Sequence, residues 1–223
     1  MNVEPSNAYD LQWASDGRAL LLNDFQGSRA ISLHFDEGMR VEELGRLPRL
    51  SYVACSPDGR WIAVGAWQGD GIKVWDAQQR ALVFEIPGSR AGASSARPAF
   101  SPDGNCLIAC CQQEYRFFAC GSWEQLFELK RNPIQPLPGP LAFQPHGNLL
   151  ALVASPGEVM LLDRRAMEKK ATLVSPVPIY ISDVCFDADG THLAVGTAQN
   201  GVQWWDLEGL RTELQRIGLD WID

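Results

Sequence analysis

The chain has 223 residues, of which 46% are hydrophobic and 21% are charged, so it can form a packed core and is not expected to be disordered. The formal net charge is −8, and basic residues cluster in nothing longer than pairs such as Arg164-Arg165, which argues against nucleic acid as a partner. No apolar stretch approaches the roughly 20 residues of a membrane span, and residues 1–10 lack the basic and apolar regions of a signal peptide. We therefore expect a soluble, cytoplasmic protein with no membrane partner and with its six cysteines reduced.

One short turn motif recurs along the whole chain. It reads Ser-Pro-Asp-Gly at residues 56–59 and 101–104, and altered forms of it occupy residues 14–17, 144–147 and 187–190. Proline presets φ at the second position of such a turn, aspartate stabilises the bend, and glycine accepts a positive φ. The turn glycines lie at positions 17, 59, 104, 147 and 190, with spacings of 42, 45, 43 and 43 residues, which predicts five repeats of one structural unit.

Each turn is expected to join two short strands. The segments that follow the turns, including residues 61–65, 149–153 and 192–196, are apolar on both faces, as in strands that other sheets cover on both sides. A third strand ends in an aromatic residue or a leucine followed by aspartate, at residues 34–36, 72–76, 159–163 and 202–206, whereas the third repeat has Ala119-Cys120 there. A fourth strand follows in most repeats, for example at residues 81–86 and 125–129. The proline-rich residues 132–140 are expected to be a stiff link between the third and fourth repeats.

The Ser-Pro-Asp-Gly, Leu-Ala-Val-Gly and Trp-Asp elements resemble WD40 repeats over nearly the whole chain. The resemblance implies an all-β fold, a β-propeller of WD40 type with five four-stranded repeats that is either closed and five-bladed or incomplete. Residues 1–206 would form this propeller, with repeats at about 8–48, 50–92, 96–138, 140–178 and 180–206. The family's Gly-His pair is missing, because His34, His146 and His192 lie elsewhere in the repeat. The side-chain network of that histidine is therefore expected to be absent, and packing and strand pairing should stabilise each blade.

After Asp206 the apolar pattern changes to a helical period. Leu207, Leu210, Leu214 and Ile217 share one face of a short helix that Gly218 should end, so residues 207–223 form a C-terminal helix and tail. This helix takes the place of the outer strand of the fifth repeat. Only residues 2–6 could supply that strand, and they are interrupted by a proline.

The C-terminal sequence carries a second, narrower resemblance. Its Trp-Asp-Leu at 205–207, its short helix and its Gly-Leu-Asp-Trp at 218–221 are similar to the tails of WD40 regions attached to large bacterial Ser/Thr protein kinases. The chain has neither the Gly-rich phosphate loop nor the His-Arg-Asp catalytic loop of a kinase. The resemblance therefore implies a non-catalytic, regulatory part of such a bacterial protein.

Neither the cysteines nor the histidines form a recognisable catalytic or metal site. Cys106 and Cys110 would lie roughly 13 Å apart on one extended strand, at about 3.3 Å per residue, which is too far for one zinc ion. His146 and His192 belong to predicted turns, and the chain has no Gly-x-Ser-x-Gly motif, so a Ser-His-Asp hydrolase is not supported. We expect no enzymatic activity, no metal and no cofactor. The alternative is a propeller hydrolase with a metal ion held by carboxylates at the axis.

The expected function is binding, at loops on one rim of the propeller. Trp67 precedes the 68–71 loop, and the WD40 resemblance implies that this loop and the connection into the next inner strand share the usual peptide-binding rim. Aromatic residues and arginines dominate binding hot spots. The candidate contacts chosen on this basis are Arg49, Trp67, Arg90, Arg97, Tyr115 and Tyr180. The sequence thus predicts a scaffold that binds a protein or peptide; the alternatives are a regulatory fragment of a kinase and, if the propeller is incomplete, a homodimer.

Overall fold

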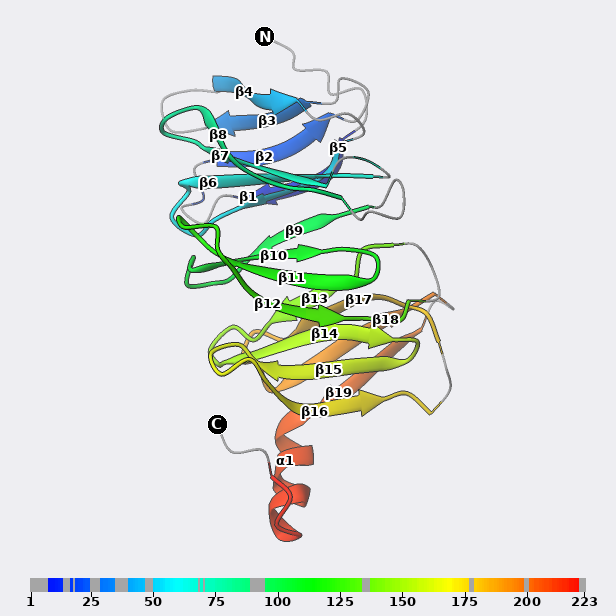
Figure 1. The fold of residues 1–223 in the computed structure, drawn as a ribbon. Coiled ribbons are helices and arrows are strands. Elements are labelled where there is room, and N and C mark those ends of the chain that lie inside the picture. The colour runs from blue at the N-terminus through cyan, green and yellow to red at the C-terminus, as the bar shows by residue number, and fades with distance from the viewer. Residues whose placement is uncertain are drawn as a thin grey trace. The chain divides into compact units, whose positions relative to one another are not determined.

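The computed structural model describes residues 8–13, 17, 19–24, 29–34, 40–46, 50–67, 69, 71–88, 95–133, 137–176, 179–198 and 201–220 (Figure 1). The chain divides into two compact units. The first comprises Met1–Leu129 with Gln135–Pro138, and the second comprises Lys130–Ile134 with Gly139–Asp223. The chain passes between the units at residues 129/130, 134/135 and 138/139, so the division spans the end of β12 (Gln125–Lys130) and the proline-rich residues 132–140, where the sequence predicts the link between the third and fourth repeats.

The first unit contains three four-stranded sheets within its described residues. The first sheet is formed by β1 (Ala8–Trp13), β2 (Ala19–Asp24), β3 (Arg29–His34) and β4 (Arg40–Arg46). The second is formed by β5 (Leu50–Cys55), β6 (Trp61–Ala66), β7 (Ile72–Asp76) and β8 (Ala81–Ile86). The third is formed by β9 (Arg97–Phe100), β10 (Cys106–Cys110), β11 (Glu114–Ala119) and β12 (Gln125–Lys130). In each sheet the strands lie in chain order, so every strand pairs with the next one along the sequence.

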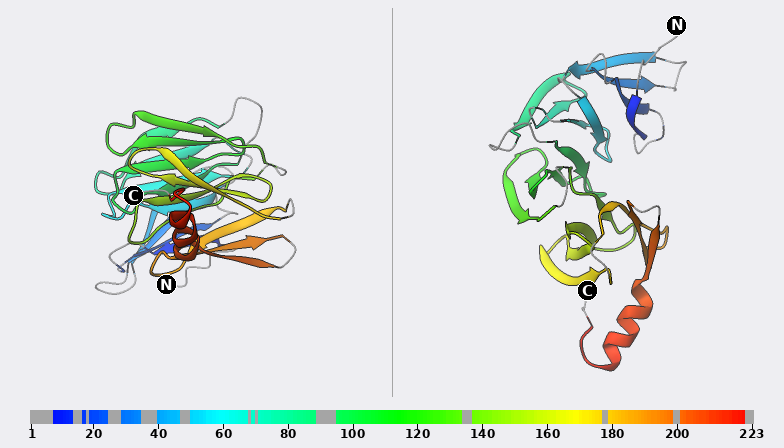
Figure 2. Two further views of the ribbon diagram at one scale, coloured as in Figure 1. Left: turned by 90° about the horizontal axis from the view of Figure 1, so that it is seen from below. Right: turned by 90° about the vertical axis from the view of Figure 1, so that its right-hand side faces the viewer.

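The second unit contains two sheets and the one helix found in the described chain. The fourth sheet is formed by β13 (Leu141–Phe143), β14 (Leu149–Ser155), β15 (Glu158–Asp163) and β16 (Glu168–Val174). The fifth has three strands among the described residues, β17 (Ile181–Phe186), β18 (His192–Thr197) and β19 (Val202–Asp206). Helix α1 (Leu207–Arg216) directly follows β19, where the other sheets have a fourth strand (Figure 2).

The predicted all-β fold with four-stranded antiparallel sheets and a short C-terminal helix is confirmed. The Asp206 side chain begins the helix by accepting a hydrogen bond from the Gly209 N–H at 2.7 Å. The helix ends at Ile217 and Gly218, as its sequence predicts. Phe35 and Asp36, expected at the end of a third strand, lie outside the described residues, as does the segment 2–6.

The recurrent turn is closed by the side chain of its first residue. That side chain accepts a hydrogen bond from the backbone N–H five residues later. The pairs are Ser56 with Trp61, Ser101 with Cys106, Gln144 with Leu149 and Asp187 with His192, at 2.8, 2.9, 3.2 and 3.1 Å. The glycine of the turn has a positive φ in four of the five repeats, 72° at Gly59, which disfavours other residues there, and Gly147 is the exception. The motif therefore recurs because one hydrogen-bonded turn connects the first two strands of several sheets.

The aspartate at the end of the third strand fixes the next turn in a similar way. Asp76 Oδ1 accepts hydrogen bonds from the N–H groups of Gln78 and Gln79, both at 2.9 Å. Asp163 Oδ1 accepts from Arg165 and Ala166, both at 2.8 Å. These hydrogen bonds hold the pKa of both carboxyls below the usual range. The largest effect comes from the Gln79 N–H at Asp76 and from the Ala166 N–H at Asp163. Aspartate recurs here because it satisfies two backbone donors of the loop to the fourth strand.

Neighbouring sheets within a unit share apolar clusters. In the first unit, Ile72 and Val74 of β7 belong to one cluster with Leu107 of β10. In the second unit, Val159 and Leu161 of β15 belong to one cluster with members of β17 and β18, namely Ile181, Val184, Phe186, Leu193 and Val195. Alternate residues of a third strand thus pack on the first two strands of the following sheet. This stacking buries both faces of the inner strands, as their apolar composition predicts.

Candidate functional site

Two of the predicted contact residues lie at the same end of the second and third sheets. Trp67 follows β6 and Arg97 begins β9, and the Ala96 N–H donates a hydrogen bond to the Ala66 carbonyl at 3.1 Å. Gly65 permits this close approach, because a Cβ at that position would lie 2.0 Å from the Ala96 oxygen. Trp67 is half-buried and Arg97 is exposed. Trp67 and Arg97 are therefore each the next residue after one partner of this backbone hydrogen bond.

Asp10 of β1 joins this group. Its Oδ2 accepts a hydrogen bond from the Val53 N–H at 3.0 Å, which ties the first sheet to the second. Burial raises the pKa of Asp10, and the Val53 N–H and the positive charge of Arg97 act in the opposite direction. Arg97 is therefore within electrostatic reach of this carboxyl group. Asp10 could not be predicted as part of this group, because Val53, whose N–H it binds, lies 43 residues away along the chain.

Tyr180 lies in the second unit, immediately before β17. It is half-buried, and its carbonyl oxygen accepts a hydrogen bond from the Ala198 N–H at 3.1 Å. Burial raises the pKa of the Tyr180 phenol, and the charge of Arg131 opposes this shift. Arg131 Nε donates to the Val153 carbonyl at 3.3 Å, which holds the arginine in place. Arg131 thus lies within electrostatic reach of Tyr180, and the sequence predicted only the tyrosine as a contact.

The other three predicted contacts are not found on the described surface. Tyr115 is completely buried, with 0% of its surface exposed. It occupies an inward position of β11, where Tyr115 and Phe117 alternate with half-buried Arg116. The Tyr115 ring is therefore part of the core and is not an exposed contact residue. The position of a residue within the repeat does not by itself predict which side chains of β11 point inward. Arg49 and Arg90 lie outside the described residues.

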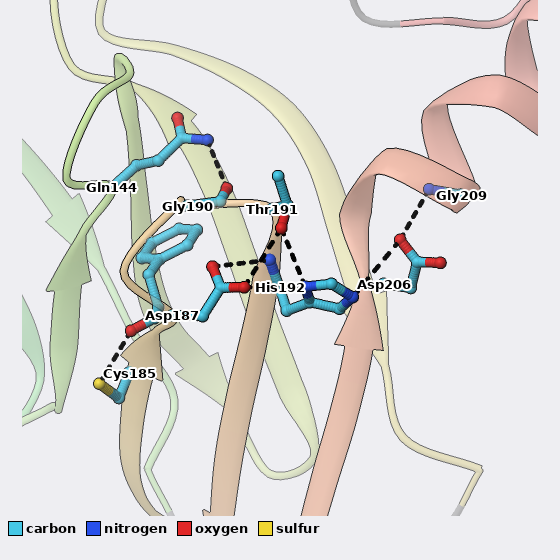
Figure 3. Close-up of polar contacts among 9 residues, drawn as sticks. Gln144, Cys185, Asp187, Gly190, Thr191, His192, Asp206 and Gly209 are labelled. Atoms are coloured by element: carbon cyan, nitrogen blue, oxygen red, sulfur yellow. Dashed lines mark hydrogen bonds and ion pairs between the residues drawn. The ribbon is translucent and has the colours of Figure 1, made fainter.

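A separate polar cluster surrounds His192 at the turn between β17 and β18 (Figure 3). His192 Nδ1 lies 2.8 Å from Asp187 Oδ2 and 2.9 Å from Thr191 Oγ1. His192 Nε2 faces Asp206 Oδ1 at 4.0 Å. The imidazole stacks on the Trp204 indole with ring centroids 4.9 Å apart. The fifth sheet therefore has a side-chain network around a histidine, and the expectation that packing and strand pairing alone stabilise every blade is wrong for this sheet.

The geometry of the His192 cluster suits a structural role. In a Ser-His-Asp arrangement the acid and the nucleophile contact opposite nitrogens of the imidazole. Here Asp187 and the Thr191 hydroxyl share Nδ1, and a second carboxylate faces Nε2. Hydrogen bonds to Asp187 lower its pKa to about 2. The largest effect comes from the backbone N–H of His192, followed by the His192 ring and the Thr191 hydroxyl. Asp187 thus closes the turn, as Ser56 does in the second sheet.

The remaining candidates for chemistry give no further site. Across the described ranges, no group of three or more His, Cys, Asp or Glu side chains could hold a metal ion. Burial raises the pKa of Cys106 to about 11 and of Cys120 to about 12, so both thiols are protonated at neutral pH and are poor nucleophiles. The one described helix is too short to span a membrane.

Comparison with known proteins supports the fold. The family model "WD domain, G-beta repeat" matches residues 48–76 and 170–206, which include β5 to β7 and β17 to β19. These matches support membership of the WD40 β-propeller family. A chain of Kuenenia stuttgartiensis hydrazine synthase has a similar structure, with a TM-score of 0.66 and 18% sequence identity over 85% of this chain. The match spans 55% of the hydrazine synthase chain, and at this identity it shows the fold alone. Among curated proteins, no match was found.

Proposed function

We propose that this chain is a non-catalytic, cytoplasmic protein-interaction scaffold that binds a peptide or a partner domain through Trp67 and Arg97. The observation that carries this proposal is the backbone hydrogen bond between Ala66 and Ala96, which brings the segments that carry a half-buried tryptophan and an exposed arginine together at one end of the second and third sheets. WD40 repeats generally serve as interaction scaffolds, and the family matches support this class. The name of the hydrazine synthase denotes an enzyme, but a likeness in fold does not transfer its activity.

The chemistry of this site favours a ligand with an acidic group beside an apolar side chain. The exposed Arg97 guanidinium can hold a carboxylate by two parallel hydrogen bonds. Trp67, at the same end of these sheets, keeps part of its surface accessible and offers an apolar contact. Arg97 would also retain its attraction to Asp10, so the ligand carboxylate competes with a carboxyl that burial disfavours in its charged form.

The test is a selection of peptides from a display library on the full chain, followed by calorimetry with the peptides obtained. We expect acidic and apolar peptides, and we expect Trp67→Ala and Arg97→Ala each to weaken their binding by about tenfold or more. Arg165→Ala is the matched control, since Arg165 is exposed on the turn before β16. Equal affinity of all three variants would refute the proposed site, provided that their circular dichroism matches that of the unmodified chain.

We further propose that the five sheets act as the blades of an incomplete propeller and that the chain is related to the regulatory WD40 regions of bacterial Ser/Thr kinases. In the tail motif that carries this resemblance, Asp220 accepts hydrogen bonds from Arg211 Nε at 3.2 Å and from Gln215 Nε2 at 2.8 Å. The tail residue of the Gly-Leu-Asp-Trp motif thus has a defined place on α1. Binding of the chain to the catalytic domain of such a kinase would support this relation.

A further inference from the structure

The third strands of the second, fourth and fifth sheets can be compared position by position. Each strand ends in an aspartate, and the residues two and four positions before it lie on one face. In β7 these residues are Val74 and Ile72, and in β15 they are Leu161 and Val159; all four are buried under the following sheet. In β19 they are Trp204 and Val202, which are 60% and 70% exposed. The fifth sheet therefore exposes the face that a following sheet covers elsewhere.

The first strand of each sheet supplies the other half of this packing. The residues four and six positions before the turn glycine are Cys55 and Val53 in β5, and Phe186 and Val184 in β17, and all are buried against the preceding sheet. In β1 the equivalent residues are Trp13 and Leu11, which are 57% and 58% exposed. The first sheet therefore exposes the face that packs on a preceding sheet elsewhere.

Large exposed apolar side chains are otherwise confined to outer positions. Among the described residues, the remaining ones lie on the fourth strands or near the end of α1, namely Leu82, Leu126, Val174, Ile217 and Leu219. Leu11, Trp13, Val202 and Trp204 alone lie on the first three strands of a sheet. On the first three strands of the described sheets, exposed large apolar side chains are thus restricted to two faces, and a sheet face of this kind is typical of an interface.

We propose that a second copy of this chain covers these faces, with the first sheet of one copy packed on the fifth sheet of the other. Each chain carries both halves of the contact that already joins its internal sheets, so a second copy continues an established type of packing. The two halves differ, which makes the contact head-to-tail and not a pairing of identical faces. A foreign partner would need a sheet face of the same kind, whereas a second copy supplies it without further requirement.

The area of such a contact favours a closed pair of chains with two contacts. Three strands of five residues, spaced by about 4.8 Å and with a rise of about 3.3 Å per residue, cover on the order of 240 Å² in projection. One contact buries two such faces, on the order of 480 Å², which is small for a stable interface. Two contacts bury four faces, on the order of 1,000 Å² as a flat projection. Side chains that protrude from the faces add to this area, which then approaches the roughly 1,200–2,000 Å² of stable complexes.

The test measures molar mass by light scattering for the unmodified chain and for two single variants, Leu11→Glu and Trp204→Glu. We expect twice the 24.6 kDa of one chain for the unmodified protein, and a single-chain mass for each variant alone. An equimolar mixture of the two variants should regain mass at high concentration, because Leu11→Glu retains an intact fifth sheet and Trp204→Glu retains an intact first sheet. Leu126→Glu, at an exposed position of β12, is the matched control and should stay dimeric.

Three outcomes would overturn the proposal. An unmodified chain that is monomeric at all concentrations would show that no second copy is bound and would favour closure within one chain. Loss of dimers in Trp204→Glu but not in Leu11→Glu would indicate a contact between two fifth sheets. A mixture that stays at single-chain mass would exclude the head-to-tail contact. Because Trp204 stacks on His192, Val202→Glu replaces Trp204→Glu if circular dichroism shows that the latter does not fold.

Discussion

At the scale of single residues, the first side chain of the recurrent turn determines how the turn responds to solution conditions. Ser56 and Ser101 close their turns with a neutral hydroxyl, whereas Asp187 closes its turn with a carboxylate that also contacts the His192 ring and the Thr191 hydroxyl. The same backbone donor is satisfied in each case. Among the four turns whose closing hydrogen bond the structure describes, only that of the fifth sheet depends on the charge of the group that closes it.

This difference predicts an acid sensitivity that belongs to Asp187. Its pKa falls from the ordinary value of 3.8 to about 2 in the folded chain, so the folded state binds the proton more weakly than the unfolded state does. The stabilisation is therefore fully present above pH 3.8 and is lost as the pH falls from 3.8 towards 2. We expect Asp187→Asn to lower the urea midpoint at pH 7 and to flatten its dependence on pH in this window.

The measurement is urea unfolding followed by fluorescence at several pH values between 2 and 7. Asp189→Asn is the matched control, since Asp189 is an exposed carboxylate of the same turn. An Asp187→Asn variant whose midpoint falls with acid as steeply as that of the control would contradict the assignment.

At the scale of elements, the residues after the third strand decide whether a fourth strand or a helix follows. Asp76, Asp163 and Asp206 all accept hydrogen bonds from the backbone two or three residues later. After Asp76 and Asp163 the loop ends in a residue with positive φ, Arg80 at 53° and Met167 at 55°, and the chain turns back as a strand. After Asp206 the apolar residues follow a helical period, and Leu207 is buried at the start of α1.

The left-handed residue in the loop from β15 to β16 predicts a stabilising substitution. A non-glycine residue in this conformation costs roughly 1–2 kcal/mol, of which glycine would recover a part after its greater freedom in the unfolded chain is subtracted. We expect Met167→Gly to raise the free energy of unfolding of the second unit by about 0.5–1 kcal/mol. Urea unfolding measures this change in the free energy of unfolding. Ala166→Gly is the control, because Ala166 does not have a positive φ. No gain of Met167→Gly over Ala166→Gly would show that the loop is not strained.

The elements could be predicted from sequence because their causes are local. The turn motif, the aspartate at the end of the third strand and the helical period after Asp206 each depend on contacts within a few residues. The candidate site was harder to predict. Asp10 contacts a residue 43 positions away, and the phase of β11 that buries Tyr115 is set by packing between sheets and not by the order of residues. The His192 network was missed because it brings β19 to a histidine of the preceding strand.

At the scale of the whole molecule, the division into two units implies that a core mutation acts on one unit first. Leu161 is fully buried in a cluster whose members all belong to the second unit. Leu161→Ala leaves a cavity there and should cost about 2–5 kcal/mol. Loss of stability spreads only through elements that unfold cooperatively with the mutated one.

We therefore expect Leu161→Ala to increase hydrogen exchange in peptides from β13 to β19, with peptides from β5 to β11 keeping their protection. Hydrogen exchange read by mass spectrometry distinguishes the two sets directly. Val174→Ala, at an exposed position of β16 in the same unit, should change neither set. Equal loss of protection in both sets would mean that the five sheets unfold together, as a cooperative assembly in which the proline-rich link transmits stability from one unit to the other.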